Sequence, residues 1–186
     1  MDKTVGIIGL GRCGMPAAKR FVEKGYRVYG YARRAEVIRE FESVGGKHEP
    51  NPAAVARSSK TVIVMVLNDA QVLDVISGEN GVLAEAEAGS MVVCMSTINR
   101  DNLESVFRMC SERGIKFVDC PFTGGPARVA AGTLTLIAAA QPETLAEARP
   151  ALEVLGQITN AGEVPGMGQA TNCLLYTSPS PETVLD

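Results

Sequence analysis

Several classes of functional site lack the residues that they would need in this sequence. A single histidine, His48, stands among 186 residues with no partner at a recognisable spacing, which severely limits histidine-based catalysis. The five cysteines are odd in number and never spaced as C-x-x-C, which excludes a recognisable zinc motif or disulfide framework. We therefore expect reduced thiols, no metal site and a cytoplasmic location.

An excess of charge and long apolar runs are also lacking. The 18 basic residues face 21 acidic ones, a formal charge of -3, so there is no electrostatic basis for binding nucleic acid. No apolar run approaches the roughly 18 to 20 residues that cross a bilayer, so we expect no membrane partner. The opening MDKTVGIIGLG passes directly into glycines and does not have the pattern of a signal peptide.

Hydrophobic residues are abundant, at 46%, and their spacing indicates alternating strands and helices. Short apolar runs predict buried strands at 4–10, 26–31, 61–67, 90–96, 116–122 and 133–140. Spacings of three and four residues predict helices at 14–24, 35–44, 100–113 and 142–155. This alternation predicts an α/β fold with a Rossmann-type, doubly wound and mainly parallel sheet.

The loop after the first predicted strand has the spacing of a dinucleotide-binding site. GLGRCG supplies Gly9, Gly11 and Gly14 as G-x-G-x-x-G between a strand and a helix. Gly9 permits a tight turn, Gly11 leaves room for a diphosphate, and Gly14 lets the helix pack closely, while the helix N-terminus attracts the anion. Cys13 also lies in this loop, and we expect it to serve simple packing; a thiol pKa lowered by the helix N-terminus is the alternative.

The segment after the second predicted strand favours NADP(H) over NAD(H). An NAD-binding domain places Asp or Glu here for the ribose 2'-hydroxyl, whereas this chain has Ala32, Arg33 and Arg34. Two guanidinium groups suit a 2'-phosphate, and both stand where the dipole of the following helix disfavours cations. Residues at odds with their local preference are more often functional, although two solvated surface arginines are the alternative.

Four blocks extend this pattern: GLGRCGMPAA, MVLNDAQV, STINRD and DCPFTGGPARVAAGTLT. Over residues 4–171 the chain resembles the N-terminal part of the β-hydroxyacid dehydrogenase family, which includes 3-hydroxyisobutyrate, tartronate semialdehyde and 6-phosphogluconate dehydrogenases. The resemblance implies hydride transfer between the cofactor and a small 3-hydroxy acid or its semialdehyde or keto form. The glycine loop and the resemblance together predict cofactor contacts from Gly9, Leu10, Gly11, Arg12, Cys13, Gly14, Met15, Ala32, Arg33, Arg34, Leu67, Asn68 and Thr97.

The third and fourth blocks carry the substrate residues that the family implies. Ser96 matches a residue that meets the substrate at the catalytic centre. DCPFTGG matches the substrate-binding pattern D-x-P-x-S-G-G with Thr in place of Ser, and backbone N–H groups would face a substrate carboxylate at Thr123, Gly124 and Gly125. Arg128 would add a charge-assisted contact to the carboxylate; a solvated side chain is the alternative.

The catalytic lysine of the family is missing. It lies at the seventh position of G-x-G-x-x-x-K, which counted from Gly166 is Asn172. A lysine amine can take the hydroxyl proton during oxidation and return it during reduction, whereas an amide cannot exchange its proton at any useful pH. Leu175 and Tyr176 stand where the family has a further asparagine. We therefore expect this chain to be inactive.

The sequence departs from the family after position 172. CLLYTSPSP resembles a translated sequencing-adapter read, and a Lys codon interrupted there would become an Asn codon. We expect residues 1–165 to form the NAD(P)-binding domain, 166–172 to begin an interdomain helix, and 173–186 to be non-native; a natural divergent C-terminus is the alternative. The all-helical domain of the family, and a dimer or larger assembly, are expected only of a full-length parent.

Two other interpretations stay open. The chain could be a non-catalytic NADP-binding module that has lost its lysine. It could also be the cofactor domain of a related imine or keto reductase that uses a different proton donor.

Overall fold

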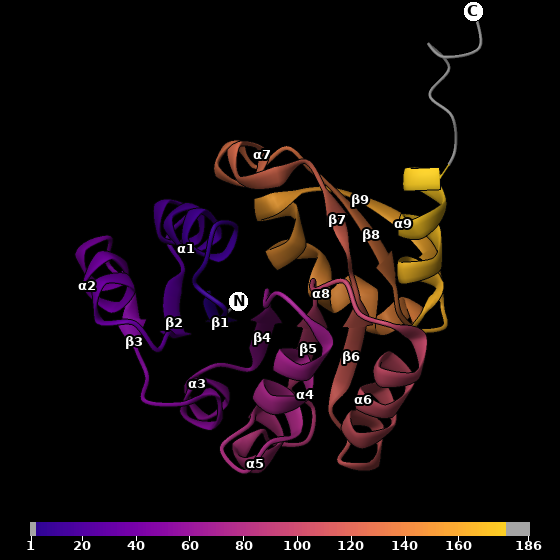
Figure 1. Ribbon diagram of the computed structural model, residues 1–186, viewed down its shortest axis with the longest axis horizontal. Helices are drawn as coiled ribbons and strands as arrows, with labels where there is room; N and C mark the ends of the chain where they lie inside the picture. The colour runs from indigo at the N-terminus through magenta and orange to yellow at the C-terminus, as the bar shows by residue number, and fades with distance from the viewer. Residues whose placement is uncertain (1–2, 178–186) are drawn as a thin grey trace, which may run out of the picture.

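A mainly parallel β-sheet runs through the centre of the fold (Figure 1). A computed structural model describes residues 3–177. Within that range nine strands form one sheet in the order β3-β2-β1-β4-β5-β6-β8-β7, and β9 pairs with β8. Their bounds are β1 Thr4–Ile8, β2 Arg27–Tyr31, β3 Lys47–His48, β4 Thr61–Val64, β5 Met91–Cys94, β6 Lys116–Asp119, β7 Phe122–Thr123, β8 Leu134–Ala139 and β9 Gly156–Gly162.

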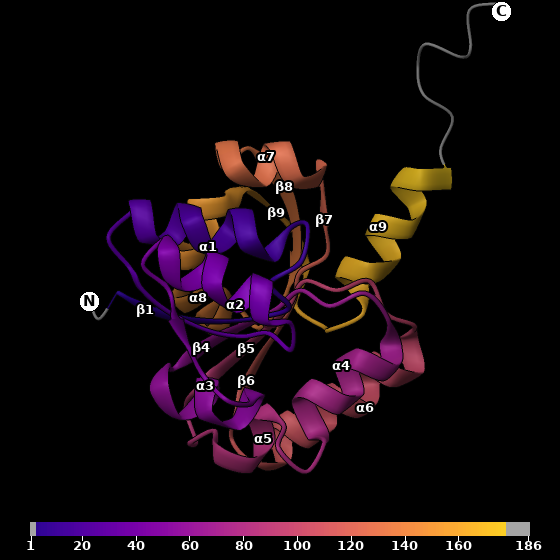
Figure 2. The same cartoon turned by 60° about the vertical axis from the view of Figure 1, so that its left-hand side comes forward.

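Helices cover both faces of this sheet, as Figure 2 shows. Buried side chains of α1, α2 and α8 form one hydrophobic core with the sheet, and those of α3, α4, α5 and α6 form a second core on the opposite face. Helix α9 lies apart from these groups and packs on β8, β9 and β6. The helix bounds are α1 Gly14–Glu23, α2 Ala35–Ser43, α3 Pro52–Ser58, α4 Asp69–Ser77, α5 Val82–Glu85, α6 Arg100–Glu112, α7 Gly125–Ala131, α8 Pro142–Leu155 and α9 Met167–Thr177.

The strand register aligns the loops that matter for function. Ile8 is paired with Tyr31 on one side and with Val64 on the other, and Val64 is in turn paired with Cys94. The loops that follow these four residues therefore leave the sheet side by side. In doubly wound sheets a ligand binds in this place, at the carboxyl ends of strands where the winding reverses.

The predicted α/β architecture and mainly parallel sheet are confirmed. The structure adds strands β3 and β9 and helices α3, α4 and α5, and two of the expected strands differ from it as follows. The run expected as one strand over 116–122 divides into β6 and β7, and β8 is antiparallel to both. The strand expected over 61–67 ends at Val64, and Leu67 is 90% exposed. Leu67 is therefore an exposed loop residue and not part of a covered strand.

The last described helix does not end where the sequence pattern was expected to change. Helix α9 runs from Met167 to Thr177 and so continues past position 172. Residues 178–186, most of the segment expected to be non-native, lie outside the described residues. Among residues 3–177, no helix has both the length and the apolar character needed to cross a membrane.

Candidate functional site

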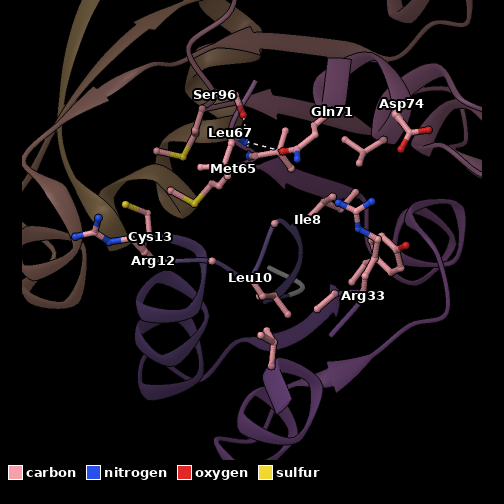
Figure 3. A pocket seen from close by; sticks show the side chains of 18 of the residues that line it. Ile8, Leu10, Arg12, Cys13, Arg33, Met65, Leu67, Gln71, Asp74 and Ser96 are labelled. Atoms are coloured by element: carbon pink, nitrogen blue, oxygen red, sulfur yellow. Dashed lines mark hydrogen bonds between the residues drawn. The ribbon is translucent and has the colours of Figure 1, made fainter. Parts of the chain in front are cut away.

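A cavity of about 620 Å³ opens where the loops after β1, β2, β4 and β5 come together (Figure 3). The glycine loop and the segment after β2 form two of its walls, and the segments after β4 and β5 form the others. Eleven predicted site residues line it, namely Gly9, Leu10, Gly11, Arg12, Cys13, Ala32, Arg33, Arg34, Leu67, Ser96 and Thr97. Gly14, Met15 and Asn68 do not line it.

The glycine loop leaves space for an extended anion. Gly9 has a φ of +98°, and a Cβ there would stand 2.3 Å from the carbonyl oxygen of Met65, so the position requires glycine. A Cβ on Gly14 would stand 1.9 Å from the carbonyl oxygen of Gly9, so Gly14 closes the loop on itself as well as bringing α1 near the sheet. Around Gly11, by contrast, a Cβ would meet nothing within 4 Å.

The N-terminus of α1 faces this open space. Cys13 is the N-cap residue, its side chain makes no capping hydrogen bond, and the first turn contains no acidic residue. The N–H of Met15 already bonds to the carbonyl of Gly11, and Pro16 has no N–H. Within the described residues, the N–H of Gly14 and the positive end of the helix dipole are therefore what remains for a ligand, and they fit a diphosphate. Burial raises the pKa of the Cys13 thiol, although the charge of Arg12 lowers it. The alternative of a lowered thiol pKa at this helix N-terminus is therefore wrong, because desolvation outweighs the neighbouring positive charge, and Cys13 packs against the core of α1, α2 and α8.

The two arginines after β2 differ in their surroundings. Arg34 is the N-cap residue of α2, and its Nη1 lies 3.5 Å from Oε1 of Glu36. No ion pair of Arg33 is found within residues 3–177. Both side chains line the cavity. A phosphate held at this end would therefore meet the guanidinium group of Arg33, and that of Arg34, which also lies near Glu36.

A carboxylate that sequence reasoning missed lines the same cavity. Gln71, Asp74 and Val75 project from one face of α4, as their spacing of three and four residues requires. A carboxylate for the ribose is expected directly after β2, whereas the fold brings Asp74 in from α4. Its one local signal is its position in the last turn of a helix, where the dipole disfavours a negative charge.

Hydrogen bonds hold the loop after β4. The Oγ of Ser96 accepts from the N–H of Val66 at 2.9 Å and donates to the carbonyl of Val64 at 3.5 Å, and Ser96 is 4% exposed. The Oε1 of Gln71 accepts from the N–H of Leu67 at 2.9 Å. Asn68, predicted to bind the cofactor, caps α4 instead by accepting from the N–H of Gln71 at 3.0 Å.

The predicted substrate segment lies next to the cavity rather than in its wall. Phe122 lines the cavity, whereas Thr123, Gly124, Gly125 and Arg128 do not. Gly124 and Gly125 have φ values of +129° and +69° as the chain turns into α7. The Arg128 side chain is exposed, and its Cδ would lie 2.8 Å from a Cβ on Gly124.

A buried carboxylate holds the start of α9. Asp119, at the end of β6, is fully buried, and its Oδ2 accepts from the N–H groups of Gly166 at 2.8 Å and Gln169 at 3.2 Å. The side-chain amide of Gln169 donates to Oδ1 of Asp119 and to the carbonyl of Ser96, both at 3.0 Å. A Cβ on Gly168 would stand 2.8 Å from Oδ2, so this glycine permits the close approach. Burial raises the pKa of Asp119, and the N–H donors partly offset that rise.

Asn172 lies one turn beyond Gln169 on α9. It is 3% exposed, and among the described residues its Oδ1 has no hydrogen-bond partner. A buried amide oxygen without a donor is unfavourable, so packing alone does not explain an asparagine at this position. It does not line the cavity.

Residues 4–172 match the family described as the NAD binding domain of 6-phosphogluconate dehydrogenase. The chain belongs to this family. It is 30% identical over 169 residues to L-threonate dehydrogenase from Cupriavidus necator, covering 90% of this chain and 57% of that protein. It is 32% identical over 167 residues to mitochondrial 3-hydroxyisobutyrate dehydrogenase from Mus musculus, with 89% and 50% covered. The chain thus spans about half the length of the curated relatives that it matches.

Solved structures agree with this family. The Mycobacterium tuberculosis 3-hydroxyisobutyrate dehydrogenase, solved with L-serine, is 25% identical and has a TM-score of 0.86, covering 94% of this chain and 59% of that one. Psf3 in complex with NADP+ is 29% identical with a TM-score of 0.83, covering 93% and 61%. An imine reductase from Pseudomonas sp., at 21% identity and a TM-score of 0.84, shares the fold.

Proposed function

We propose that the cavity binds NADP(H) in preference to NAD(H). The open side of Gly11, next to the uncapped N-terminus of α1, carries this proposal because it offers both the space and the donors that a diphosphate needs. Arg33 and Arg34 would hold the 2'-phosphate, and Thr97 with the exposed Leu67 would contact the nicotinamide end. Gly14, Met15 and Asn68 would act by shaping the loops.

The whole protein would be an oxidoreductase that interconverts a small 3-hydroxy acid and its semialdehyde or keto form. The nicotinamide, when bound, supplies or accepts a hydride. Thr123, Gly124 and Gly125 would bind the substrate carboxylate, with Arg128 adding charge. The hydroxyl of Ser96 already bonds within the protein, so Ser96 would act mainly by placing the loop beside the substrate. The homologous dehydrogenases support this substrate class.

This chain as given would bind the cofactor without turning over substrate. Oxidation of a hydroxyl requires a group that takes its proton, and the amide of Asn172 cannot do so. Residues 1–165 would form the cofactor domain and 166–172 the start of the helix that follows, while further domains and a dimer would belong to a longer parent protein. The non-catalytic NADP-binding module is the second candidate, and Asn172 is the observation that favours it.

Calorimetric titration of the 186-residue chain tests the proposal. We expect saturable binding of NADPH, weaker binding of NADH, and no change of NADPH absorbance with a panel of small semialdehydes and keto acids. Absence of binding by both cofactors would refute the proposed function. Substrate-dependent NADPH oxidation would refute the proposed inactivity and would require a different proton donor.

A further inference from the structure

The cavity has a polar end at which both signs of charge meet. Figure 3 shows Arg33 and Asp74 at one end of the cavity, with Arg12 and Cys13 at the other. Asp74 supplies the one acidic side chain among the lining residues that the structure describes. It is exposed, and no ion pair of its carboxylate is found within residues 3–177. Its charge is therefore available to whatever occupies this end.

We propose that Asp74 is a specificity-determining residue that lowers the preference for NADP(H) and lets the protein accept NAD(H) as well. This inference rests on the proposed function, since it assumes that the dinucleotide lies along the cavity with its diphosphate at Gly11. The adenosine ribose then lies at the end that Arg33 and Asp74 share. A carboxylate there repels a 2'-phosphate, and it accepts a hydrogen bond from a free ribose hydroxyl.

The balance of charges explains why one carboxylate changes the outcome. Arg34 already lies near Glu36, so Arg33 is the main cation left for the phosphate. Asp74 offsets part of the attraction of Arg33. Because both side chains are exposed to solvent, the offset is moderate rather than absolute. The protein would therefore prefer NADPH without excluding NADH.

The position of Asp74 on its own helix supports a role outside folding. Asp74 stands in the last turn of α4, where a negative charge faces the negative end of the helix dipole. Gln71 and Val75, on the same helical face, also line the cavity. A carboxylate that opposes its helix while facing a cavity is better explained by a ligand than by the helix.

The test compares NADPH and NADH affinities of the unmodified 186-residue chain, Asp74→Asn and Glu79→Gln by calorimetry at low and physiological salt. Glu79→Gln removes the same charge from an exposed residue just after α4 that does not line the cavity. We expect Asp74→Asn to tighten NADPH binding by about two- to tenfold at low salt, with NADH binding unchanged or weaker. Glu79→Gln should leave the ratio of the two affinities unchanged.

An unchanged ratio of affinities in Asp74→Asn, or an equal shift in Glu79→Gln, would overturn the assignment of Asp74 while leaving the cofactor site intact. Failure of the unmodified chain to bind either cofactor would overturn the proposed function and this inference together. Arg33→Gln supplies the opposite change: it should weaken NADPH binding and leave NADH binding nearly unaffected. An equal loss of affinity for both cofactors in Arg33→Gln would place Arg33, and with it Asp74, away from the 2'-position of the ribose.

Discussion

A single glycine provides the sharpest test of where the diphosphate lies. Gly11 has no positive φ, and a Cβ at this position would have no atom within 4 Å, so the free protein has room for valine. Gly11→Val should therefore keep the melting temperature nearly unchanged yet weaken NADPH binding by about tenfold or more, because the side chain would fill the anion space. Ala127→Val, on the exposed side of α7, is the matched control. Unchanged NADPH affinity in Gly11→Val would move the diphosphate away from this loop.

At the residue scale, the sequence predicts site residues that lie near one another along the chain. It does not predict those that come together only in the fold. The glycine loop and Arg33 could be identified because their spacing relative to a strand is itself the signal. Asp74 reaches the cavity only because the fold places α4 beside the loop after β4, where the side chain of Gln71 accepts from the N–H of Leu67. Nothing near Asp74 in the sequence relates it to Arg33. The raised pKa of the Cys13 thiol could not be predicted for a similar reason, since burial depends on the whole fold.

At the element scale, the attachment of α9 depends on Asp119. Asp119→Asn keeps one oxygen for the N–H groups of Gly166 and Gln169 but places an N–H₂ group opposite the side-chain amide of Gln169, which now donates to Oδ1. We expect a loss of about 1 to 3 kcal/mol of stability. The amides of Gly166 and Gln169 should then exchange their hydrogens faster than those of the β1–β4 core. Glu87→Gln, on an exposed loop, controls for the loss of charge. Equal exchange in the unmodified chain and Asp119→Asn would show that α9 is held by its apolar contacts instead.

The same carboxylate gives a pH dependence with a definite sign. Burial raises the pKa of Asp119 above its ordinary value of 3.8, so the folded protein holds this proton more tightly than the unfolded chain. Its contribution to stability is full below about pH 3.8 and is lost as the pH rises through the raised pKa. The free energy of unfolding of the unmodified chain, minus that of Asp119→Asn, should therefore decrease as pH increases over this interval. Urea titrations at several pH values would measure it, and an increasing difference would contradict the raised pKa.

Apolar runs and helical spacing made many elements predictable, and their absence hid others. The buried strands β1, β4 and β5 are short continuous apolar runs, and the buried residues of helices α1 and α8 recur at intervals of three and four. Strand β9, whose sequence is GQITNAG, has mostly partly exposed or exposed residues, so its pairing with β8 comes from backbone bonds and not from an apolar signal. Helix α3 is only seven residues long and begins at Pro52, too short for a period to emerge.

At the scale of the whole molecule, we expect activity to require more than a lysine at position 172. The chain spans about half the length of its curated relatives, and we propose that the rest of the substrate site belongs to that missing length. Asn172→Lys should leave NADPH affinity unchanged, because position 172 does not line the cavity. It should lower the melting temperature, because the position is 3% exposed and an ammonium group there would lose its hydration. It should give no turnover in the 186-residue chain.

Asn172→Gln, which keeps the position neutral, separates the cost of charge from that of size. Turnover by Asn172→Lys alone would show that residues 1–186 already contain a complete substrate site. The proposal that a further domain completes this site would then fail.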